Sequence, residues 1–319
     1  MSRLKISVCI STYNHCRYIE HCILSVISQN VSAEVEILVG NDGSTDGTTE
    51  IIEELTRQYD GRIIHIHRRE NIGPFENLKL LILKAQGDFI AHLDGDDYWQ
   101  PGKLRAQMSF LVNNPGCVAC YTNAWVVRDD LTPMGIFNNT IPVRFDLRFL
   151  LCKGNFLNHS SIFYRAVYKV NILNFPTNFI DYRIHIELAM HGALGYINAP
   201  YVVYRYASSQ SMIRLANEQV RNLYLEAVLY GLSNDSIDDV YDVTLEDFVA
   251  RIVRDGLAAA NPKFLFRWFR VLSQNIKKER ARILLFGSIG GLLKLFAAIL
   301  RRILTILRLT NELRVINER

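Results

Sequence analysis

Phe89-Ile90-Ala91-His92-Leu93-Asp94-Gly95-Asp96-Asp97 is the stretch that decides the fold of this chain of 319 residues. Its first five residues form a short apolar run, which predicts a buried strand. Three carboxylates follow within the next four positions. Acids this close repel one another, so their clustering at a strand end indicates a cation or another positive partner. A divalent ion with oxygen ligands, completed by a phosphate, fits this arrangement. A solvated turn of acids is the alternative.

Short apolar runs and helical patterns alternate on both sides of this strand. We expect strands over residues 6–10, 35–39, 62–66 and 88–93, with helices over residues 17–28, 48–59 and 75–85 between them. Apolar strands joined by helices are typical of an α/β fold, here a Rossmann-like, mostly parallel sheet flanked by helices. The pattern continues with a helix at 103–112, a strand at 118–127, a helix at 184–190 and a strand at 201–206. We therefore expect one domain over residues 1–211 and a helical extension over residues 212–319.

Polar clusters follow three of the expected strands. They are Ser11-Thr12-Tyr13-Asn14, Asn41-Asp42-Gly43-Ser44 and the acidic stretch from Asp94 to Asp97. Ligands of such sheets bind beyond the carboxyl ends of the strands, where the crossover order reverses. Asp42 can accept hydrogen bonds from a nucleobase or a ribose hydroxyl, although an Asp-Gly turn followed by a helix cap is the alternative. The chain lacks a phosphate-cradling P-loop, so we expect a metal near Asp94 and Asp96 to neutralise any phosphate.

Composition excludes several classes of protein. The chain is 49% hydrophobic and holds 15 Tyr and 16 Phe, which excludes disorder. Six scattered cysteines, including Cys117 and Cys120 without a second pair for zinc, predict free thiols in a reducing compartment. No apolar signal segment precedes the first strand, so we expect the protein in the cytosol. We expect no nucleic acid as a partner.

Four segments, taken together, resemble a known family. Ile10-Ser11-Thr12-Tyr13-Asn14, Val39 to Thr48, Asn71-Ile72-Gly73 and Asp94-Gly95-Asp96-Asp97 are similar to motifs of the family-2 inverting glycosyltransferases with the GT-A fold. The resemblance covers residues 4 to about 211. It implies a transferase of hexosyl or N-acetylhexosaminyl groups, of the type that builds bacterial surface polysaccharides. A nucleotide diphosphate sugar, which we expect to be a UDP-sugar, would be the donor, and a glycan or lipid-linked molecule the acceptor.

The resemblance also assigns roles to residues of this chain. It implies that the nucleotide is bound by Ser11, Tyr13, Asp42, Asn71 and Asp94. Asp94 and Asp96 match the acidic pair that holds the diphosphate through Mn²⁺ or Mg²⁺. Such a cation stabilises the leaving group as a Lewis acid.

An inverting transfer also needs a base for the acceptor hydroxyl. Asp181 matches the family's base, which lies near a helix start, although it could also cap that helix. Two departures from the family bear on activity. Ile180 stands where many relatives have Glu, and Ala207 stands where relatives often have His after Tyr-Arg-x. The second departure puts metal affinity in doubt unless Arg205 or a water replaces the His. It leaves open a catalytically silent relative that binds nucleotide sugars or scaffolds an assembly.

Four further residues are predicted to contact the donor sugar or the acceptor. His159 and Ser160 belong to the loop over residues 154–161, which lies where relatives contact both substrates. Arg205 is the third. Trp99 could stack on a sugar face, and an aromatic of the core or of a lid is the alternative.

The last part of the chain is strongly basic. From Lys263 to Arg319 there are 13 Lys and Arg against 3 Asp and Glu, a net charge of +10, whereas the preceding residues carry −6. Lys294, Arg301 and Arg308 recur every seven residues within a mostly apolar segment, which predicts one polar stripe on a helix. We expect a basic amphipathic tail over about residues 277–310. It would lie on the anionic inner face of the cell membrane, making the protein peripheral and cytoplasmic.

Two alternatives for the tail remain open. The helix could pack on the catalytic domain, or it could pair with a partner in a homodimer. Gly287 and Gly291 have the G-x-x-x-G spacing of close helix pairs, but we interpret this spacing as chance.

Overall fold

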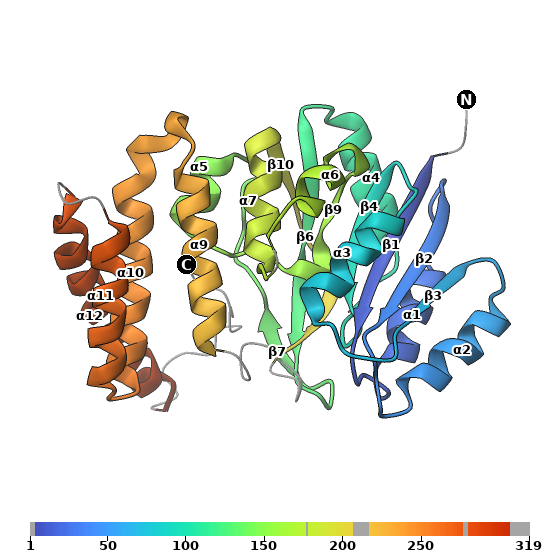
Figure 1. Cartoon of the computed structure of the whole chain (residues 1–319), viewed down its shortest axis with the longest axis horizontal. Helices are drawn as coiled ribbons and strands as arrows, with labels where there is room; N and C mark the ends of the chain where they lie inside the picture. Colours follow the sequence, from blue (N-terminus) through green and yellow to red (C-terminus); the bar gives the residue numbers. More distant parts are fainter. Residues whose placement is uncertain (1–3, 177, 207–216, 277–279, 307–319) are drawn as a thin grey trace. The chain divides into compact units, whose positions relative to one another are not determined.

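The computed structural model describes residues 4–176, 178–206, 217–276 and 280–306 (Figure 1). The strands are β1 Lys5–Thr12, β2 Glu34–Asn41, β3 Ile63–His67, β4 Phe89–Asp94, β5 Tyr98–Trp99, β6 Cys117–Val127, β7 Pro133–Ile136, β8 Arg144–Phe145, β9 Phe163–Arg165 and β10 Ala193–Arg205. The α-helices are α1 Ile19–Ile27, α2 Thr48–Gln58, α3 Pro74–Lys84, α4 Lys103–Asn113, α5 Leu147–Lys153, α6 Lys169–Leu173, α7 Asp181–His191, α9 Asn217–Leu232, α10 Tyr241–Ala258, α11 Pro262–Asn275 and α12 Arg282–Ile306. Three 3₁₀ turns complete the described part of the chain: η1 His159–Ser161, η2 Ala166–Tyr168 and η3 Asp235–Val240.

Within the described ranges, the strands form one mixed sheet of ten strands. Its main order is β3-β2-β1-β4-β9-β6-β10-β5, with β7 beside β6 and β8 beside β10. The four strands from β3 to β4 are all parallel, as the sequence predicted. β9 runs antiparallel to both β4 and β6, and β10 runs parallel to β6. The parallel sheet of the N-terminal half is therefore extended by a mixed half that the sequence did not reveal.

Crossover direction explains how helices cover both faces of the sheet. The chain steps from β1 to β2 to β3 in one direction and then returns past β1 to β4. Right-handed crossovers therefore place α3 on the face opposite to α1 and α2. In Figure 1, α3, α6 and α7 lie on the nearer face, and α3 contacts α6, which contacts α7. The reversal between β1 and β4 creates the switch point at which such sheets bind ligands.

The core agrees with the apolar periodicity of the sequence. Ile6, Val8 and Ile10 of β1 are fully buried, and the inward residues of α1, among them Ile19 and Ile23, pack in the same cluster. Cys117 and Cys120 are buried free thiols on β6, and the other four cysteines are also unpaired.

The chain divides into two compact units. Among the described residues, the first unit holds those up to Leu147 and from Phe156 to Ala227, and the second holds Arg148–Asn155 and those from Val228 to Ile306. The division falls inside α9, and the boundary that we expected near residue 211 lies outside the described residues. All the candidate site residues belong to the first unit, whereas α10, α11 and α12 belong to the second.

Candidate functional site

Three polar strand ends meet around the end of β1. Ser11 pairs with Asp94 of β4, and Thr12 pairs with Asn41 of β2. The amide of Gly95 donates to the Ser11 carbonyl at 2.8 Å, and the amide of Asp42 donates to the Thr12 carbonyl at 3.0 Å. Asp42 and Asp94 therefore flank the same strand, two strand spacings or about 10 Å apart. The prediction that these strand ends share one rim is confirmed.

Asp42 anchors the loop that carries Asn71. Its two carboxylate oxygens accept hydrogen bonds from the amides of Ile72 and Gly73, each at 2.9 Å, and its side chain is buried. The Asn71 side-chain oxygen accepts a third bond from the Gly73 amide at 3.0 Å. Gly43 follows Asp42 with φ of +72°, and a Cβ there would lie 2.7 Å from the Glu70 carbonyl carbon, so only glycine fits. Each oxygen of Asp42 keeps a lone pair for another donor.

Ser11 is held by a residue that the sequence did not single out. The Asn77 side chain on α3 donates to the Ser11 hydroxyl at 3.0 Å and to the Gly40 carbonyl at 2.9 Å. Its own amide oxygen is buried without a hydrogen-bond partner. Asn77 was missed because it lies on the buried face of α3, where the sequence pattern predicts a packing residue and gives no sign of a contact with β1.

The loop after β1 is tied to the loop after β2. The Asn14 amide donates to the Ser44 hydroxyl at 2.9 Å, and the Asn14 side-chain oxygen accepts from the Thr45 amide at 2.8 Å. Asn14 adopts a left-handed conformation with φ of 53°, which Asn tolerates better than most residues. These bonds fix the backbone beside Tyr13, whose ring is half-buried.

The acidic loop uses its three carboxylates differently. Asp94 and Asp96 are half-exposed, whereas Asp97 is buried. The Ser160 hydroxyl donates to Asp97 at 2.6 Å and accepts from the Asp94 amide at 3.1 Å. The backbone amide of Arg205 donates to Asp97 at 2.9 Å, and its guanidinium Nε donates to the Asp96 carbonyl at 2.7 Å. Asp97 is therefore buried within the loop and holds it in place, whereas Asp94 and Asp96 stay partly exposed.

Electrostatics at this loop favour a cation. Burial, followed by the charge of Asp96, raises the pKa of Asp94, and the same two causes, together with the charge of Asp94, raise the pKa of Asp97. In the part of the chain that the structure describes, no three His, Cys, Asp or Glu residues form a ready metal cage. Asp94 and Asp96 therefore fit a divalent ion only if phosphate oxygens complete its shell.

His15 is a second residue that the sequence did not point to. Its Nδ1 lies 3.2 Å from the Thr12 hydroxyl, and its charge lowers the pKa of Asp94. A basic side chain therefore lies beside the acidic loop.

Asp181 is the first residue of α7, and its side chain is 31% exposed. Its Oδ1 accepts from the Tyr182 amide at 2.8 Å, and its Oδ2 lies 3.9 Å from Nε2 of His185. The Tyr121 hydroxyl lies 2.9 Å from Nδ1 of the same imidazole. Burial lowers the pKa of His185, so the ring is neutral. A hydroxyl that donates to Nδ1 leaves the proton on Nε2, facing the carboxylate, and we assign this tautomer from the hydrogen-bond pattern.

The Tyr204 hydroxyl is influenced by the charges of both Asp181 and the acidic loop. Burial raises the pKa of Tyr204, and the next causes are the charges of Asp97, Asp96, Asp94 and Asp181. The candidate base and the candidate metal ligands are therefore both within electrostatic reach of Tyr204.

Three of the four residues predicted to contact the sugar or the acceptor are buried, which argues against direct contact. Trp99 is 2% exposed, its indole N–H donates to the Ser160 carbonyl at 2.8 Å, and the Lys103 ammonium lies 3.9 Å above its ring. Trp99 is thus the core aromatic of the two alternatives. Ser160 and Arg205 are also buried and support the acidic loop from beneath. The sequence could not reveal this, because burial here depends on contacts between distant segments.

His159 remains a candidate for contact with the donor sugar or the acceptor. It is half-buried, its ring centroid lies 5.0 Å from that of His92, and its Nδ1 has no hydrogen-bond partner. Asp181 is close enough to raise the pKa of His159, although burial lowers it overall. Ala207, which replaces the family's His, lies outside the described residues.

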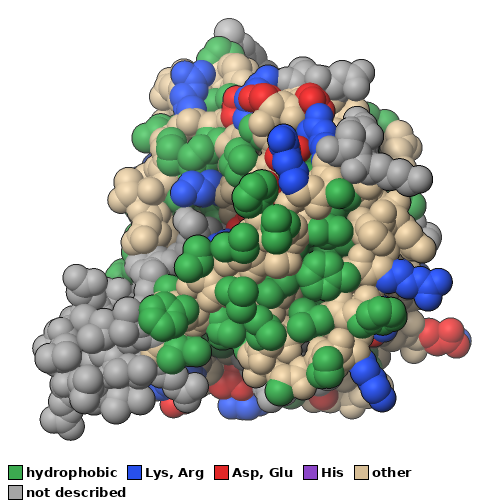
Figure 2. Space-filling view, turned by 90° about the vertical axis from the view of Figure 1, so that its left-hand side faces the viewer, with side chains coloured by type: hydrophobic (Ala, Val, Ile, Leu, Met, Phe, Trp, Pro, Cys, Tyr) green, Lys and Arg blue, Asp and Glu red, His purple; other side chains and the backbone are tan. Residues whose placement is uncertain are grey.

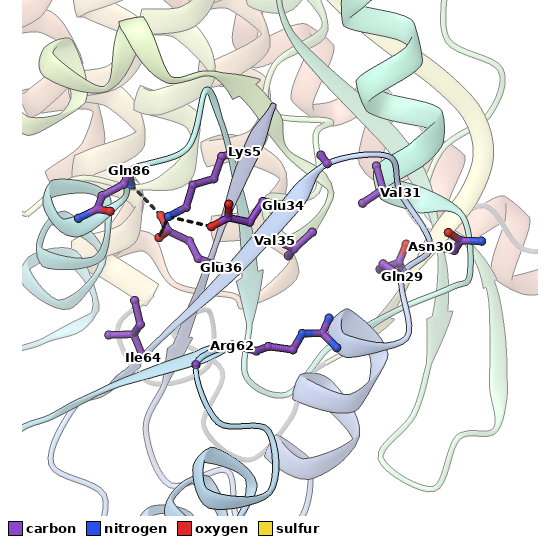
Figure 3. Close-up of a pocket in the computed structure, with 12 residues that line it drawn as sticks. Lys5, Gln29, Asn30, Val31, Glu34, Val35, Glu36, Arg62, Ile64 and Gln86 are labelled. Atoms are coloured by element: carbon purple, nitrogen blue, oxygen red, sulfur yellow. Dashed lines mark hydrogen bonds and ion pairs between the residues drawn. The ribbon is translucent and has the colours of Figure 1, made fainter. Parts of the chain in front are cut away.

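A separate pocket lies at the opposite edge of the sheet (Figure 3). Lys5 and Glu34, which begin β1 and β2, are among its lining residues. Glu36 accepts from the Gln86 amide at 2.7 Å and pairs with the Lys5 ammonium at 2.8 Å. These ion pairs neutralise the charges and connect the beginning of β1 to β2. The pocket therefore has a structural role and is distinct from the candidate site at the carboxyl ends of the strands.

Comparison with other sequences gives matches over the same region. The sequence profile described as Glycosyl transferase family 2 matches residues 7–168. An uncharacterised protein of Mycobacterium tuberculosis (strain ATCC 25618 / H37Rv) is 30% identical over 206 residues, which are 62% of this chain and 58% of that protein. The glycosyltransferase TuaG of Bacillus subtilis (strain 168), named for teichuronic acid biosynthesis, is 33% identical over 132 residues, which are 41% of this chain and 51% of TuaG. The matches thus span little more than half the length of these relatives.

Solved structures share the arrangement of strands and helices. The structure of S. aureus TarS 1–349 in complex with UDP-GlcNAc has a TM-score of 0.70 and 18% identity, covering 92% of this chain and 89% of that chain. The mannosyltransferase PcManGT from Pyrobaculum calidifontis, in complex with GDP-Man and Mn²⁺, has a TM-score of 0.55 and 16% identity, covering 93% and 88%. At these identities the likeness concerns the fold alone.

Proposed function

Because the chain belongs to glycosyl transferase family 2 and has the GT-A fold, we propose that it is an inverting glycosyltransferase. It moves a sugar from a nucleotide diphosphate donor to an acceptor hydroxyl. The observation that carries this proposal is the meeting of Asp42 and Asp94 around the end of β1, with Asp181 in electrostatic reach of the same region. Nucleotide, diphosphate and acceptor each have a candidate partner there.

The nucleotide binds between the ends of β1 and β2. Asp42 is anchored by two backbone amides, and its remaining lone pairs suit a donor such as the N–H of uracil. Ser11, Tyr13 and Asn71 line the same strand ends. A UDP-sugar is the donor we expect, because TarS was solved with UDP-GlcNAc. A hexosyl or N-acetylhexosaminyl group is transferred.

The diphosphate lies at the acidic loop. Asp94 and Asp96 would hold Mn²⁺ or Mg²⁺, which supplies Lewis-acid stabilisation of the departing nucleotide diphosphate. PcManGT, whose fold this chain shares, was solved with Mn²⁺. Arg205 and Ser160 keep the loop in place through Asp97 and the loop backbone. His15 lies where a basic group can contact phosphate oxygens.

Asp181 accepts the proton of the acceptor hydroxyl. Its exposure and its position at the start of α7 suit a base, and the helix dipole favours its ionised form. The Tyr182 amide donates to Oδ1 of Asp181, and Nε2 of His185 lies 3.9 Å from Oδ2, so both contacts orient the carboxylate. His159 completes the acceptor side of the region.

A glycan or lipid-linked acceptor fits the family and the named role of TuaG in teichuronic acid biosynthesis. We place the enzyme in polysaccharide biosynthesis, peripheral on the cytoplasmic face of the cell membrane. Nucleic acid is not among its partners.

Release of nucleotide from labelled donors tests this function. The purified chain should release UDP from a UDP-sugar in Mn²⁺, and Asp96→Asn and Asp181→Asn should each lower the rate at least 100-fold. Asp60→Asn, which changes an exposed acid after α2, serves as the matched control and should keep the rate. The replacement of the family's His by Ala207 favours one rival, a silent sugar-nucleotide-binding relative. That rival would release no nucleotide, and Asp96→Asn would change nothing.

A further inference from the structure

The inner face of α12 packs against α10 within the second unit. A Cβ at Gly287 would lie 2.5 Å from Cβ of Val249, and one at Gly291 would lie 2.6 Å from the Ala250 carbonyl. The two helices therefore approach closely at a glycine notch formed by Gly287 and Gly291. The interpretation of this spacing as chance was wrong, because the G-x-x-x-G pattern serves a contact between α12 and α10 within the chain.

Charged groups of α12 are also bound on this inner side. The Lys294 ammonium pairs with the Asp247 carboxylate, which also pairs with Arg251 on α10. Arg282, at the start of α12, pairs with Asp242 at 2.6 Å. Lys294 therefore does not belong to an outward polar stripe. The side chain of Arg301 and the whole of Arg308, its expected partners in that stripe, lie outside the described residues.

The outer face of α12 is apolar and exposed. Seven residues define it: Leu285, Phe286, Ile289, Leu292, Leu293, Phe296 and Ile299, each between 46% and 68% exposed. At 100° per residue they span an arc of about 140°, opposite the glycine notch. Phe266 of the neighbouring α11 is 77% exposed. Figure 2 shows these helices' side of the molecule, with hydrophobic side chains gathered together and Lys and Arg around them.

The charge near the outer face of α12 favours a lipid surface over a second copy of the chain as its partner. The basic side chains of α12 that the structure describes are paired with acids of α10, but α11 carries the exposed basic residues Lys263, Arg267 and Arg270 and no acid, so this segment is positively charged. A second copy would bring two such segments together, and like charges oppose that approach. Anionic lipid headgroups attract this charge, and the acyl region accepts the apolar side chains.

Length alone would also allow α12 to cross a membrane. The window Arg282–Ile299 has a mean hydropathy of 1.7 and is 17% buried. Packing on α10 opposes crossing, because α10 carries Asp242, Asp247 and Arg251 along the contact. Charges such as these are costly in hydrocarbon. The helix therefore fits an orientation in the plane of the membrane, in which only its outer, apolar face contacts lipid.

We infer that the outer face of α12, together with Phe266, docks in the plane of an anionic lipid leaflet while α10 holds the helix from behind. This inference specifies the membrane location that we proposed above, and it does not depend on the catalytic roles. It also places Lys294 on the side of α10 and away from lipid, which differs from the striped amphipathic helix expected from the sequence.

Vesicle sedimentation with the full chain tests this docking mode. The protein should bind vesicles of phosphatidylcholine with added phosphatidylglycerol, and more weakly those of phosphatidylcholine alone. The double variant Leu293→Ser/Phe296→Ser should lower binding at least tenfold, since it removes two inserted apolar side chains. The double variant Leu83→Ser/Val167→Ser changes residues that are 60% and 72% exposed in the first unit and should bind like the original chain.

Three outcomes would overturn the inference. Equal binding by both double variants would show that the outer face of α12 is not the docking surface. Resistance of the bound protein to alkaline carbonate would indicate a spanning helix. A dimer in light scattering that Leu293→Ser/Phe296→Ser dissociates, without vesicle binding by the original chain, would assign the face to a second copy. Donor hydrolysis measured on the same variants should be unchanged, so failure here is distinct from failure of the proposed reaction.

Discussion

The imidazole of His185 lies between two groups, the Tyr121 hydroxyl at 2.9 Å and the Asp181 carboxylate at 3.9 Å. If Tyr121 donates to Nδ1, then Nε2 carries the proton and its positive edge faces Asp181. That arrangement orients the carboxylate that we propose as the base. It also stabilises the carboxylate without protonating it.

Replacing Tyr121 by Phe removes the donor that selects this tautomer. We expect Tyr121→Phe to lower kcat about tenfold, or about 1.4 kcal/mol in the barrier, with donor affinity unchanged. Tyr164→Phe is the matched control, because the Tyr164 hydroxyl bonds to His92 instead, at 3.2 Å. Steady-state kinetics and donor titration of both variants measure the effect. Equal losses in the two would mean that any buried hydroxyl matters and that the tautomer does not.

Burial of His185 also makes stability depend on pH. Its pKa is lowered in the folded chain, whereas the unfolded chain takes up this proton near pH 6.5. Below that pH the unfolded state binds more protons, so stability falls as pH falls. Between pH 7.5 and 5.5 the loss from one such His is about 1 kcal/mol. His185→Gln should lose less between these pH values in urea unfolding, and His67→Gln, at an exposed position, should behave like the original chain.

Single residues also show where the sequence fell short at the site. The motif residues Ser11, Asp42 and Asp94 were found because they end strands whose pattern is clear. Trp99, Ser160 and Arg205 were assigned to sugar contact, yet they are buried beneath the acidic loop. Their burial arises from β10 and η1 lying against that loop, and such long-range contacts leave no local signal.

At the scale of elements, length and periodicity decided what could be predicted. The strands of the N-terminal half and the helices α1 to α4 were expected within a few residues of their observed bounds. β5 and β8 have two residues each and β9 has three, too few for any alternation to show. β10 was expected only over residues 201–206, but it begins at Ala193, since irregular pairing around Pro200 breaks its pattern.

The glycine notch of α12 gives a prediction at this scale. Gly287→Ala should destabilise the second unit by about 1–3 kcal/mol, because the new methyl group overlaps Val249. Gly290→Ala is the matched control: its Cβ would lie 3.6 Å from that of Ala250, an ordinary contact. Because Ala favours helix over Gly, Gly290→Ala should be neutral or stabilising by up to about 1 kcal/mol. Urea unfolding of the two variants measures the difference, and equal destabilisation would refute the notch.

At the scale of the whole molecule, binding and docking are assigned to different units. The candidate site residues lie in the first unit and the outer face of α12 lies in the second. Changes at separate, uncoupled sites add. A substitution on α12 should therefore leave the response to nucleotide sugars unchanged, provided that the first unit holds the whole donor site.

Thermal shifts with nucleotide sugars test this division and the donor together. A UDP-sugar at 100 times its dissociation constant should stabilise the folded state by about 2.7 kcal/mol, which raises Tm by about 5–10 °C for a unit of this size. The shift should need Mn²⁺ or Mg²⁺, because Asp94 and Asp96 repel a diphosphate without a cation. Asp42→Ala should reduce it, and Leu293→Ser/Phe296→Ser should not. A larger shift with GDP-mannose would contradict our choice of donor, and a full shift in Asp42→Ala would remove that residue from the nucleotide pocket.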